Sequence, residues 1–574
     1  MVEILAPNGQ KAKRWLAPIP VPEEVCAELK DYSPVFQQII FNRGISTAET
    51  ANVFLTDTAV EHDPLLMKGM AEAVEIIWQT IQVEKPMIVY GDYDVDGVTA
   101  TALLVQVIKS LGGIALEYIP NRFDEGYGLN SDAIQTLFNQ NAHLIITVDC
   151  GIRSVKEAEL AQELGIKLII SDHHHPREVV PSADAVICPR QVGDEYPYKE
   201  LAGVGIAYKI ARALFQRAGK DPVEAENWLD LVAIGTVADI APLTGENRLL
   251  VKKGLANIQQ HRSRHGIYSL SGAADINFSK ITAGNIGFGL GPRLNAAGRM
   301  ESARNSLDLL MSEDLEITGK LAQVLDDQNK ARQIKTKANQ EFAETQFSDI
   351  ENLPILIAFG SKDEFHEGIV GLVAARLVES YYRPAVIGVI GEETSKASCR
   401  SIDEFHITEA LDKCADLLVR HGGHSKAAGF TVLNENRDQL ISRLYQIAEE
   451  QLKVEELTAS IKYDAEVDLN ELQMPLMNFL AQIEPTGNGN SKPVFVTKGL
   501  RAIGKSKMGG EKIHLRMTVV NEKGISIGAV AFKQGFWADE MPEKIDIIYN
   551  FELNEYNDKV SFQLNVKDIH PSEG

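Results

Sequence analysis

The stretch MIVYGDYDVDG, residues 87–97, joins a short apolar run to a cluster of aspartates. Its first part, Met87–Tyr90, has the length and the apolar character that predict a buried strand. The acidic part holds Asp92, Asp94 and Asp96, and a helix is predicted soon afterwards, over residues 98–111. Since ligands of open α/β sheets bind beyond the carboxyl ends of parallel strands, this stretch predicts both an α/β fold and a ligand site.

Three further motifs have a similar construction: VDCG at 148–151, SDHHH at 171–175 and GTVADI at 235–240. Asp149 follows the apolar run 144–148, and the histidines follow the run 167–170. Asp239 follows an apolar, helix-like stretch and not a strand, so only the company of the other motifs supports it as a residue of the ligand site. We expect all four motifs to meet where the ends of parallel strands converge.

The region around these motifs alternates between the helical and the strand periodicity. Helices are predicted over 70–81, 98–111, 131–140 and 154–164, and strands over 86–90, 115–119, 144–149 and 167–171. Strands that alternate with helices of this length indicate a parallel sheet covered on both faces.

The order Asp-x-Asp-x-Asp-Gly also opens the calcium loop of an EF-hand, which is the chief alternative. An EF-hand needs an acidic residue at position twelve of its loop, and Leu103 stands there. It also needs a helix before the loop, whereas residues 87–90 predict a strand. The EF-hand interpretation therefore fails on two counts.

The ligand types of the four motifs indicate a particular chemistry. Carboxylate and imidazole ligands without thiolates suit Mn²⁺ or Mg²⁺. Histidines are more often ordinary surface or core groups than ligands, but three in a row after a buried strand indicate a metal site. This many carboxylates suits phosphodiester hydrolysis, in which two cations about 3.5–4 Å apart activate a water and stabilise the developing charge.

Length and composition set the outer limits. The 574 residues predict three to four domains of about 150 residues. A formal net charge of −23 argues against a protein that coats nucleic acid nonspecifically, but not against an enzyme that acts on it through local basic patches. Because the five cysteines form no CxxC pair, and neither a signal peptide nor a run of eighteen apolar residues is found, we expect a reduced, cytoplasmic protein without a membrane span.

The chain divides into five expected segments. They are an N-terminal flank packed on the core (1–70), the α/β domain with the motifs (71–300), a long connector helix (301–350), a second α/β domain (351–455) and a small all-β domain (456–574). No Gly or Pro interrupts residues 320–347, and apolar residues recur there at helical spacing. A helix of about 30 residues spans about 45 Å, and we interpret it as a rigid connector across a groove rather than as a plain surface helix.

The set DxDxDG, DCG, DHH and GTVAD resembles the DHH phosphoesterase superfamily, with no departure at a signature position. The segment GGHSKAAG, residues 422–429, is similar to the glycine-rich signature of the companion DHHA1 domain. Two further stretches, PNRFDEGYGLN (120–130) and GPRLNAAGRM (291–300), narrow the resemblance to the bacterial RecJ family. The resemblance covers essentially the whole chain, and it implies a DHH domain, a DHHA1 domain and a C-terminal OB-fold domain.

Carried over residue by residue, the resemblance implies a metal centre and a set of DNA contacts. The metal ligands would be Asp94, Asp96, Asp149, His173 and Asp239, with Asp92 and His174 at or beside the site. We expect two ions, bridged by Asp96 or Asp149, with His174 orienting the scissile phosphate or assisting the leaving oxygen. The residues expected to bind DNA or phosphate are Arg122, Arg293, Arg299, Ser398, Arg400, Gly422, Gly423 and His424.

Some of these assignments keep a structural alternative. From the residues alone, GGHSKAAG is as typical of a plain tight turn before a strand, and Arg293 and Arg299 are also typical of helix-capping surface residues. Phe123, Tyr127 and Phe288 are candidate stacking platforms for bases, although each is at least as typical of a core.

The resemblance implies a metal-dependent 5′-to-3′ exonuclease that degrades single-stranded DNA in repair and recombination. It also implies a single-stranded-DNA-binding protein and a RecQ-type helicase as partners, and we expect a monomer. Two alternatives are a phosphodiesterase of the same superfamily that acts on short oligonucleotides or small molecules, and a non-catalytic DNA-binding replication factor. The β-rich tail argues against the first, and the complete acidic set against the second.

Overall fold

The computed structural model describes residues 12–56, 58, 60–121, 128–300, 302–556 and 559–572. The chain forms two compact units. One comprises residues 59–335 and 485–491 and carries the four acidic motifs, and we call it the motif unit. The other comprises residues 1–58, 336–484 and 492–574, and we call it the composite unit.

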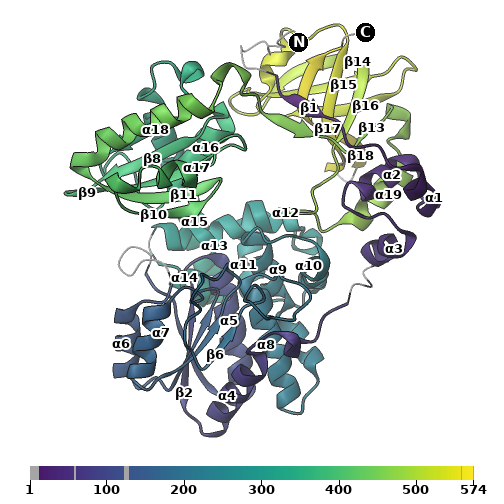
Figure 1. The fold of residues 1–574 in the computed structure, drawn as a ribbon. Helices are drawn as coiled ribbons and strands as arrows, with labels where there is room; N and C mark the ends of the chain where they lie inside the picture. Colours follow the sequence, from purple (N-terminus) through teal and green to yellow (C-terminus); the bar gives the residue numbers. More distant parts are fainter. Residues whose placement is uncertain are drawn as a thin grey trace. The chain divides into compact units, whose positions relative to one another are not determined.

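A parallel sheet forms the centre of the motif unit (Figure 1). Among the described residues, its strands pair in the order β3-β2-β4-β5-β6, and every pair is parallel. Their bounds are β2 Pro86–Gly91, β3 Ile114–Tyr118, β4 Leu144–Val148, β5 Lys167–Ser171 and β6 Ala185–Ile187. The register sets Gly91 beside Val148 and Val148 beside Ser171, so the carboxyl ends of β2, β4 and β5 lie side by side.

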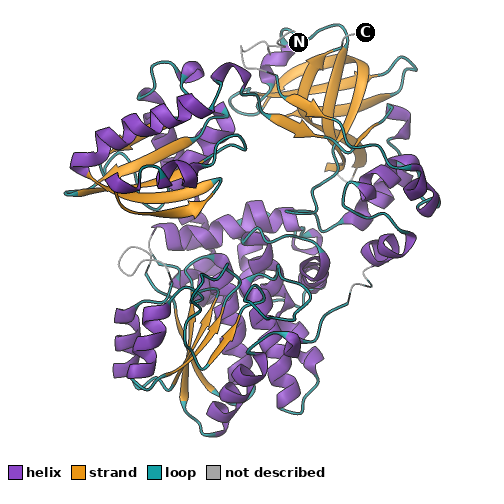
Figure 2. Ribbon diagram, in the orientation of Figure 1, coloured by secondary structure: helices purple, strands orange, loops and turns teal. Residues whose placement is uncertain are grey.

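Helices cover both faces of this sheet (Figure 2). One face packs against α6 (Ser131–Asn139) and α7 (Val155–Glu163). The other face packs against α4 (Met70–Gln82), α5 (Val95–Ser110), α8 (Gly203–Arg217) and α9 (Leu229–Ala238). Further helices of this unit include α10 Gly245–Gln259, α11 His265–Ala273, α12 Ala283–Asn285, the π-helical turn η4 Ile286–Leu290, α13 Gly291–Met300 and α14 Arg304–Met311.

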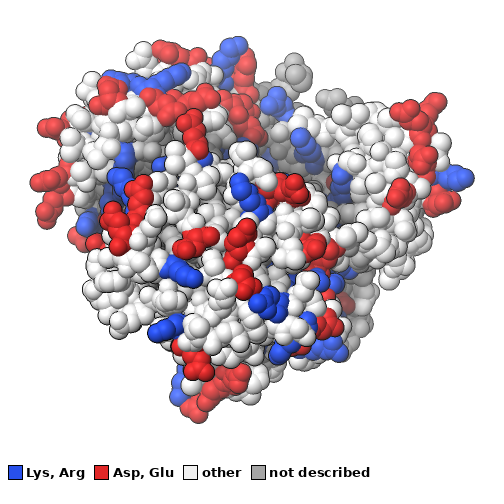
Figure 3. Space-filling view, turned by 60° about the horizontal axis from the view of Figure 1, so that its bottom comes forward, with Lys and Arg blue, Asp and Glu red and all other residues white. Residues whose placement is uncertain are grey.

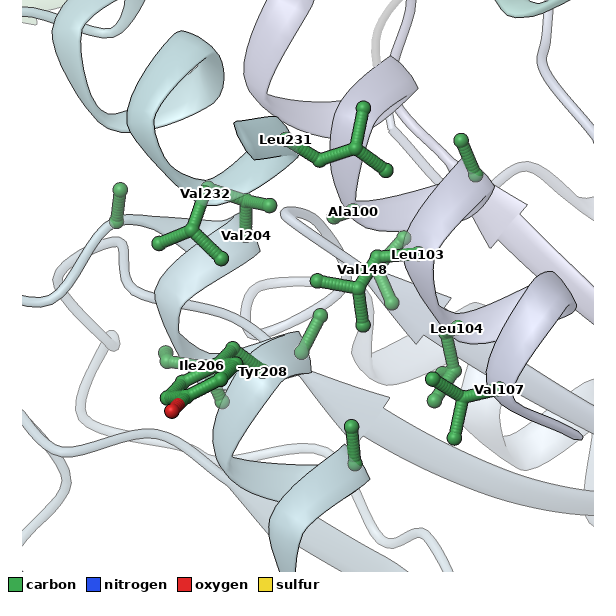
Figure 4. Close-up of a cluster of buried hydrophobic side chains, with 14 of the residues drawn as sticks. Ala100, Leu103, Leu104, Val107, Val148, Val204, Ile206, Tyr208, Leu231 and Val232 are labelled. Carbon is green, nitrogen blue, oxygen red and sulfur yellow. The ribbon is translucent and has the colours of Figure 1, made fainter. Parts of the chain in front are cut away.

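Apolar side chains fill the space where β4 meets α5, α8 and α9 (Figure 4). Leu103, Val148, Val204 and Leu231 meet there, and all four are excluded from solvent. Full burial of one such side chain contributes about 1.5–3 kcal/mol. This layer therefore fixes the first turns of α5 and α8 beside the strand ends.

The structure confirms the predicted α/β architecture of this region. The observed elements agree with the predicted ones to within one residue at each end, except that α5 begins at Val95 and not at residue 98. The reason is Asp94, whose side chain accepts hydrogen bonds from the N–H groups of Asp96 and Gly97 at 3.0 and 3.1 Å. An aspartate in this position caps the helix, and the acidic motif forms its first turn.

A long helix is present within the predicted connector segment 301–350 but does not fill it, because residues 304–311 form the separate helix α14. Helix α15, Leu315–Thr345, has 31 residues. Ala322 and Leu325 belong to the core of the motif unit, whereas Ala343 belongs to a core cluster of the composite unit. One helix therefore supplies core side chains to both units, and its role as a spacer across a groove stays a prediction.

The composite unit contains the predicted second α/β domain. Among the described residues its sheet has the order β10-β11-β9-β8-β7, with β7 and β8 parallel and the other pairs antiparallel. The elements are β7 Leu356–Gly360, α16 Val370–Tyr381, β8 Ala385–Ile390, β9 Thr394–Arg400, α17 Ile407–Asp412, β10 Leu418–His424, β11 Ala427–Leu433 and α18 Arg437–Gln451.

The C-terminal part of the chain is a closed barrel, as the predicted all-β domain requires. Within the described residues, β14, β15, β16, β18 and β17 pair in that order, and β17 pairs back to β14. This closure leaves the strands without a free edge. The elements are β12 Ser460–Lys462, β13 Ala465–Glu466, α19 Met474–Ile483, β14 Phe495–Met508, β15 His514–Val520, β16 Ser526–Ala531, β17 Ile545–Tyr556 and β18 Lys559–Pro571.

The N-terminal flank differs from its prediction, because most of it packs on the barrel domain and not on the α/β core. Phe36 stacks on Phe479 with ring centroids 4.6 Å apart, and both belong to the apolar cluster of the barrel. Trp15 donates a hydrogen bond to Asp568 at 2.9 Å. The elements involved are β1 Arg14–Leu16, which pairs with β12, and the helices α1 Glu23–Glu28, α2 Pro34–Phe41 and α3 Ala48–Thr56. A helical pattern shows which face is apolar but not which distant surface will cover it.

The other boundaries between the five predicted segments stay predictions.

No helix in the described ranges is long and apolar enough to cross a membrane. Figure 3 shows lysine and arginine side chains interspersed with acidic ones over one face of the molecule. Local basic groups are therefore present despite the net charge of −23.

The contact between α9 and α10 gives a test of this packing. A Cβ added at Gly254 would lie 2.1 Å from the carbonyl oxygen of Leu229, which is backbone and cannot move aside cheaply. We expect Gly254→Ala to destabilise the protein by about 1–3 kcal/mol, measured by urea unfolding followed by circular dichroism. The matched control is Gly319→Ala in α15, where an added Cβ meets nothing within 4 Å and the change should be neutral or stabilising. Equal stability of the two variants would contradict the packing.

Candidate metal centre

The ends of neighbouring strands bring the acidic motifs together. Asp92 follows β2, Asp149 follows β4, and Asp172 and His173 follow β5. Asp239 comes from the carboxyl end of a helix, α9, as the helix-like stretch before it predicts. Three groups of side chains have ligand atoms within 4.8 Å of one another: Asp149, His173 and His174; Asp96, His173 and Asp239; and Asp92, Asp94 and Asp149. The structure thus places the six predicted metal ligands and His174 in one cluster.

Asp96 is held by the first turn of α8. Its Oδ2 accepts a hydrogen bond from the N–H of Gly203 at 2.6 Å, and its Oδ1 accepts one from the N–H of Val204 at 2.8 Å. These N–H groups have no partner within their own helix, and the helix dipole favours a negative charge there. The buried carboxylate is therefore fixed in orientation by two backbone donors.

Close packing around the aspartates requires glycine at two positions. A Cβ added at Gly203 would lie 2.7 Å from Cβ of Asp149, and one at Gly235 would lie 3.0 Å from Oδ1 of Asp96. Asp149 itself has a φ of 62°, the left-handed conformation that aspartate tolerates better than most residues. The backbone at this strand end is therefore bent to direct the carboxylate into the cluster.

His173 lies at the centre of the cluster. Its Nε2 is 3.1 Å from Oδ1 of Asp149 and 3.9 Å from Oδ2 of both Asp96 and Asp239. Burial lowers the pKa of His173 to about 4, so its imidazole is neutral at pH 7. Neutral imidazole is the form that binds metal.

The carboxylates are poorly stabilised as anions. Burial, with the charge of Asp94 as the next cause, raises the pKa of Asp96 to about 7. Burial raises the pKa of Asp239 to about 9, with the charge of Asp96 as the next cause. Burial and the charges of Asp96 and Asp94 likewise raise the pKa of Asp149 well above its ordinary value. A positive charge in the cluster would relieve this repulsion.

Divalent cations fit this donor set. Oδ1 of Asp149 and Nε2 of His173 are buried, and neither has a hydrogen-bond partner within the described residues. Buried polar atoms are normally satisfied, so unsatisfied atoms of ligand type at one point indicate an ion. The oxygen and imidazole donors suit Mn²⁺ or Mg²⁺.

His174 differs from His173 in its partner. Its Nδ1 lies 2.7 Å from Oδ1 of Asp172, and the same oxygen accepts a hydrogen bond from the N–H of His174. Oδ2 of Asp172 accepts one from the N–H of Ile152. Burial disfavours the charged imidazolium, but the hydrogen bond and the charge of Asp172 outweigh it and raise the pKa of His174. His174 is therefore oriented and more readily protonated than an ordinary histidine.

Two of the predicted DNA-binding residues lie together in the composite unit. A Cβ added at Gly371 would lie 3.2 Å from Nη2 of Arg400 and 3.6 Å from Oγ of Ser398. Gly371 belongs to the first turn of α16, where backbone N–H groups favour anions. Ser398 and Arg400 therefore lie beside a helix amino end suited to phosphate.

The segment GGHSKAAG is a β-hairpin and not a glycine-rich loop. Gly422, Gly423 and His424 lie in β10 and pair with β11. Gly423 has a φ of 150°, and a Cβ there would lie 2.3 Å from the carbonyl oxygen of Ala427. The alternative of a tight turn before a strand therefore describes the local structure, and a phosphate contact of this exposed hairpin stays a proposal.

The guanidinium of Arg293 is held by hydrogen bonds within the motif unit. Its Nε donates to Asp326 of α15 and its Nη1 to the carbonyl of Gly289, both at 2.9 Å. Arg299 lies in the last turn of α13. Arg122, Phe123 and Tyr127 lie outside the described residues.

Comparison with known proteins decides the family. Residues 86–236 match the family model of the DHH family, N-terminal domain, residues 352–450 that of the DHHA1 domain, and residues 463–568 that of the RecJ OB domain. The chain is 37% identical to the single-stranded-DNA-specific exonuclease RecJ of Bacillus subtilis, over 98% of this chain and 71% of that protein. It is 33% identical to the RecJ of Dickeya dadantii, over 89% of this chain and 92% of that protein. The chain belongs to the RecJ family.

Structural comparison extends the likeness over nearly all of this chain. The crystal structure of RecJ from Thermus thermophilus in complex with Mn²⁺ matches with a TM-score of 0.83 and 28% identity. The match covers 98% of this chain and 80% of that one. The predicted DHH, DHHA1 and OB-fold organisation is therefore confirmed.

Two interactions that hold the residues of this RecJ centre in place were not predicted from the sequence. The first is Asp172, which orients His174. An aspartate often accepts a hydrogen bond from the N–H two residues later in the chain, so the spacing of Asp172 and His174 was the available signal. The N–H groups of Gly203 and Val204 bind Asp96, and the glycine-rich start of the helix 203–217 was the available signal.

Asp149→Asn tests the metal centre without distorting the backbone, since asparagine tolerates the left-handed conformation. Burial and neighbouring charges raise the pKa of Asp149, so its anion destabilises the fold. We therefore expect the metal-free variant at pH 8 to unfold at a higher temperature than the wild type. Mn²⁺ should raise the unfolding temperature of the wild type but not that of the variant.

The control for this variant is Asp275→Asn. Asp275 is an exposed aspartate with a φ of 55°, so it matches Asp149 in residue type and in backbone conformation. Its substitution leaves the metal cluster intact. It should respond to Mn²⁺ as the wild type does. An Asp149→Asn variant that Mn²⁺ stabilises as strongly as the wild type would show that Asp149 is not a ligand.

Proposed function

We propose that this chain hydrolyses the phosphodiester bonds of single-stranded DNA from the 5′ end, with Mn²⁺ or Mg²⁺, in two sites, as cofactor. The observation that carries the proposal is the buried cluster around His173, whose unsatisfied ligand atoms fit divalent cations. The relatives named as single-stranded-DNA-specific exonucleases support the substrate. The 5′-to-3′ direction rests on the family resemblance.

The residues of the cluster have distinct roles in this proposal. Asp92, Asp94, Asp96, Asp149, His173 and Asp239 would hold the ions, with Asp96 or Asp149 proposed as the residue shared between them. Bound divalent cations supply an activated water and neutralise charge that develops on the phosphoryl oxygens. The two backbone donors to Asp96 keep its carboxylate in one orientation, so the ligand geometry is set before substrate binds.

His174 acts on the substrate in this proposal. Asp172 raises the pKa of His174 and fixes its Nδ1, which leaves Nε2 as the atom that carries a proton toward the scissile phosphate. A protonated imidazole there orients the phosphate or gives its proton to the leaving oxygen.

Ser398, Arg400, Gly422, Gly423, His424, Arg122 and Arg299 are proposed to bind the DNA strand and its 5′ end. From the family resemblance we also propose a role in DNA repair and recombination in the cytoplasm, alongside a single-stranded-DNA-binding protein and a RecQ-type helicase. The names of the relatives support the substrate but not these partners.

Digestion of 5′- and 3′-labelled single strands and duplexes, with Mn²⁺ or Mg²⁺, tests the activity. We expect release from the 5′ end of single strands, no release from blunt duplexes and complete loss with a chelator. His173→Ala and Asp149→Asn should lower the rate by about 10³-fold or more, since metal stabilisation of the transition state amounts to several kcal/mol.

Three results would contradict this proposal. Near-wild-type rates of either variant with Mn²⁺ would show the site assignment to be wrong, while Asp275→Asn serves as the active control. Faster turnover of a dinucleotide than of a long strand would indicate the short-oligonucleotide phosphodiesterase. Binding of DNA without hydrolysis would indicate a non-catalytic factor.

Arg400→Ala tests the proposed 5′-phosphate contact. A hydrogen bond to a charged group contributes about 1.5–3 kcal/mol, so we expect the preference for a 5′-phosphate over a 5′-hydroxyl to fall by about 10- to 150-fold. The matched control is Lys396→Ala on the same face of β9, where the ammonium pairs with Glu367. If both variants keep the wild-type preference, the phosphate contact lies elsewhere.

A further inference from the structure

Phe288 is exposed to an unusual degree. With 91% of its surface in solvent, it is the most exposed of the large apolar side chains in the described part of the chain. Phenylalanine normally contributes to stability by being buried, so this position does nothing for the core. An exposed aromatic ring is suited to binding a flat apolar ligand.

The backbone around Phe288 presents the ring outward. The sequence IGFGL, residues 286–290, forms the π-helical turn η4, a rare structure that occurs often at functional sites. Ile286 and Leu290 are fully buried and anchor the turn, and Phe288 lies midway between them on the opposite side. Gly287 and Gly289 flank it and have no side chains to cover the ring.

This segment lies along the metal centre. A Cβ added at Gly291 would be 3.4 Å from Cβ of Ala238, the residue before Asp239. At the other end, a Cβ added at Gly298 would be 2.8 Å from the carbonyl oxygen of Tyr93, which lies between Asp92 and Asp94. The π-helical turn and α13 therefore run from one predicted ligand to the loop that carries two others.

A buried ion pair holds the turn in place. Arg293 donates to the carbonyl of Gly289, inside the turn, and to the carboxylate of Asp326. Asp326 is itself excluded from solvent and pairs with Lys330 at 2.6 Å. Arg293 is therefore a positioning residue for the turn, and the ring of Phe288 is presented on an ordered support.

We propose that Phe288 is a stacking platform for an unpaired nucleobase of the strand that is cut at the metal centre. The proposal rests on the proposed function and deepens it. Every base has a flat π-face, so a phenyl ring accepts any sequence, as a sequence-tolerant nuclease requires. A base in a duplex has both faces covered by its neighbours, so the contact favours single strands.

The test compares ordinary single strands with strands whose first nucleotides are abasic, using kcat/KM of the full-length enzyme with Mn²⁺. Stacking on one base corresponds to about 5- to 150-fold in affinity, so Phe288→Ala should lower kcat/KM on the ordinary strand by that factor. On the abasic strand, Phe288→Ala and the wild type should be equal. Phe288→Tyr and Phe288→Trp should keep activity, whereas Phe288→Leu, apolar but not flat, should behave as Phe288→Ala.

Two controls separate stacking from damage to the fold. Tyr268→Ala removes another exposed aromatic of the motif unit, 54% exposed on α11, and should act as the wild type on both strands. Stabilisation of Phe288→Ala by Mn²⁺ should equal that of the wild type, because the ring is no ligand.

The outcomes distinguish this proposal from the proposed function. If the wild type cuts neither strand, the proposed function fails and the stacking role fails with it. If the wild type cuts but Phe288→Ala is equally active on the ordinary strand, or loses the same factor on the abasic strand, only the stacking role is overturned.

Discussion

The buried crowding of like-charged carboxylates is the constraint on which the rest of the motif unit depends. Asp96 and Asp149 are almost entirely excluded from solvent, and burial and mutual repulsion raise the pKa of both. Such an arrangement persists only where the surrounding structure is stable enough to impose it. The parallel sheet, the apolar layer beneath it and the first turn of α8 supply that stability, and the cations that fit the cluster would remove its electrostatic cost.

Much of this was accessible from sequence because the relevant signals are local. A strand followed by Asp92, Asp94 and Asp96 places carboxylates at a sheet edge by chain geometry alone, and the repeated motifs add the others. What the sequence could not show depends on distant contacts. The packing of Phe36 on Phe479 joins segments with no shared pattern, and the engagement of Arg293 by Asp326 depends on where α15 lies. The role of a polar residue such as Arg293 depends on neighbours that the sequence alone does not reveal.

The site and the fold place different demands on glycine. Gly203 and Gly235 leave room for carboxylates, Gly254 lets two helices approach, and Gly289 leaves room for the side chain of Ile276. In each case the missing side chain creates space that the structure uses for a neighbouring group. A sequence motif rich in glycine therefore does not by itself indicate a phosphate loop, as the hairpin at residues 422–429 shows.

The contact between the two ends of the chain has a consequence for biosynthesis. Trp15 and Asp568 are hydrogen-bonded but 553 residues apart in sequence. At about 5–20 residues per second, the ribosome takes about 30–110 s to make the chain between them. During that interval the apolar faces of α1 and α2 lack their native partner, whereas residues 59–335, which form most of the motif unit, emerge as one continuous stretch. The nascent N-terminal segment is therefore the part of this protein most in need of chaperone protection.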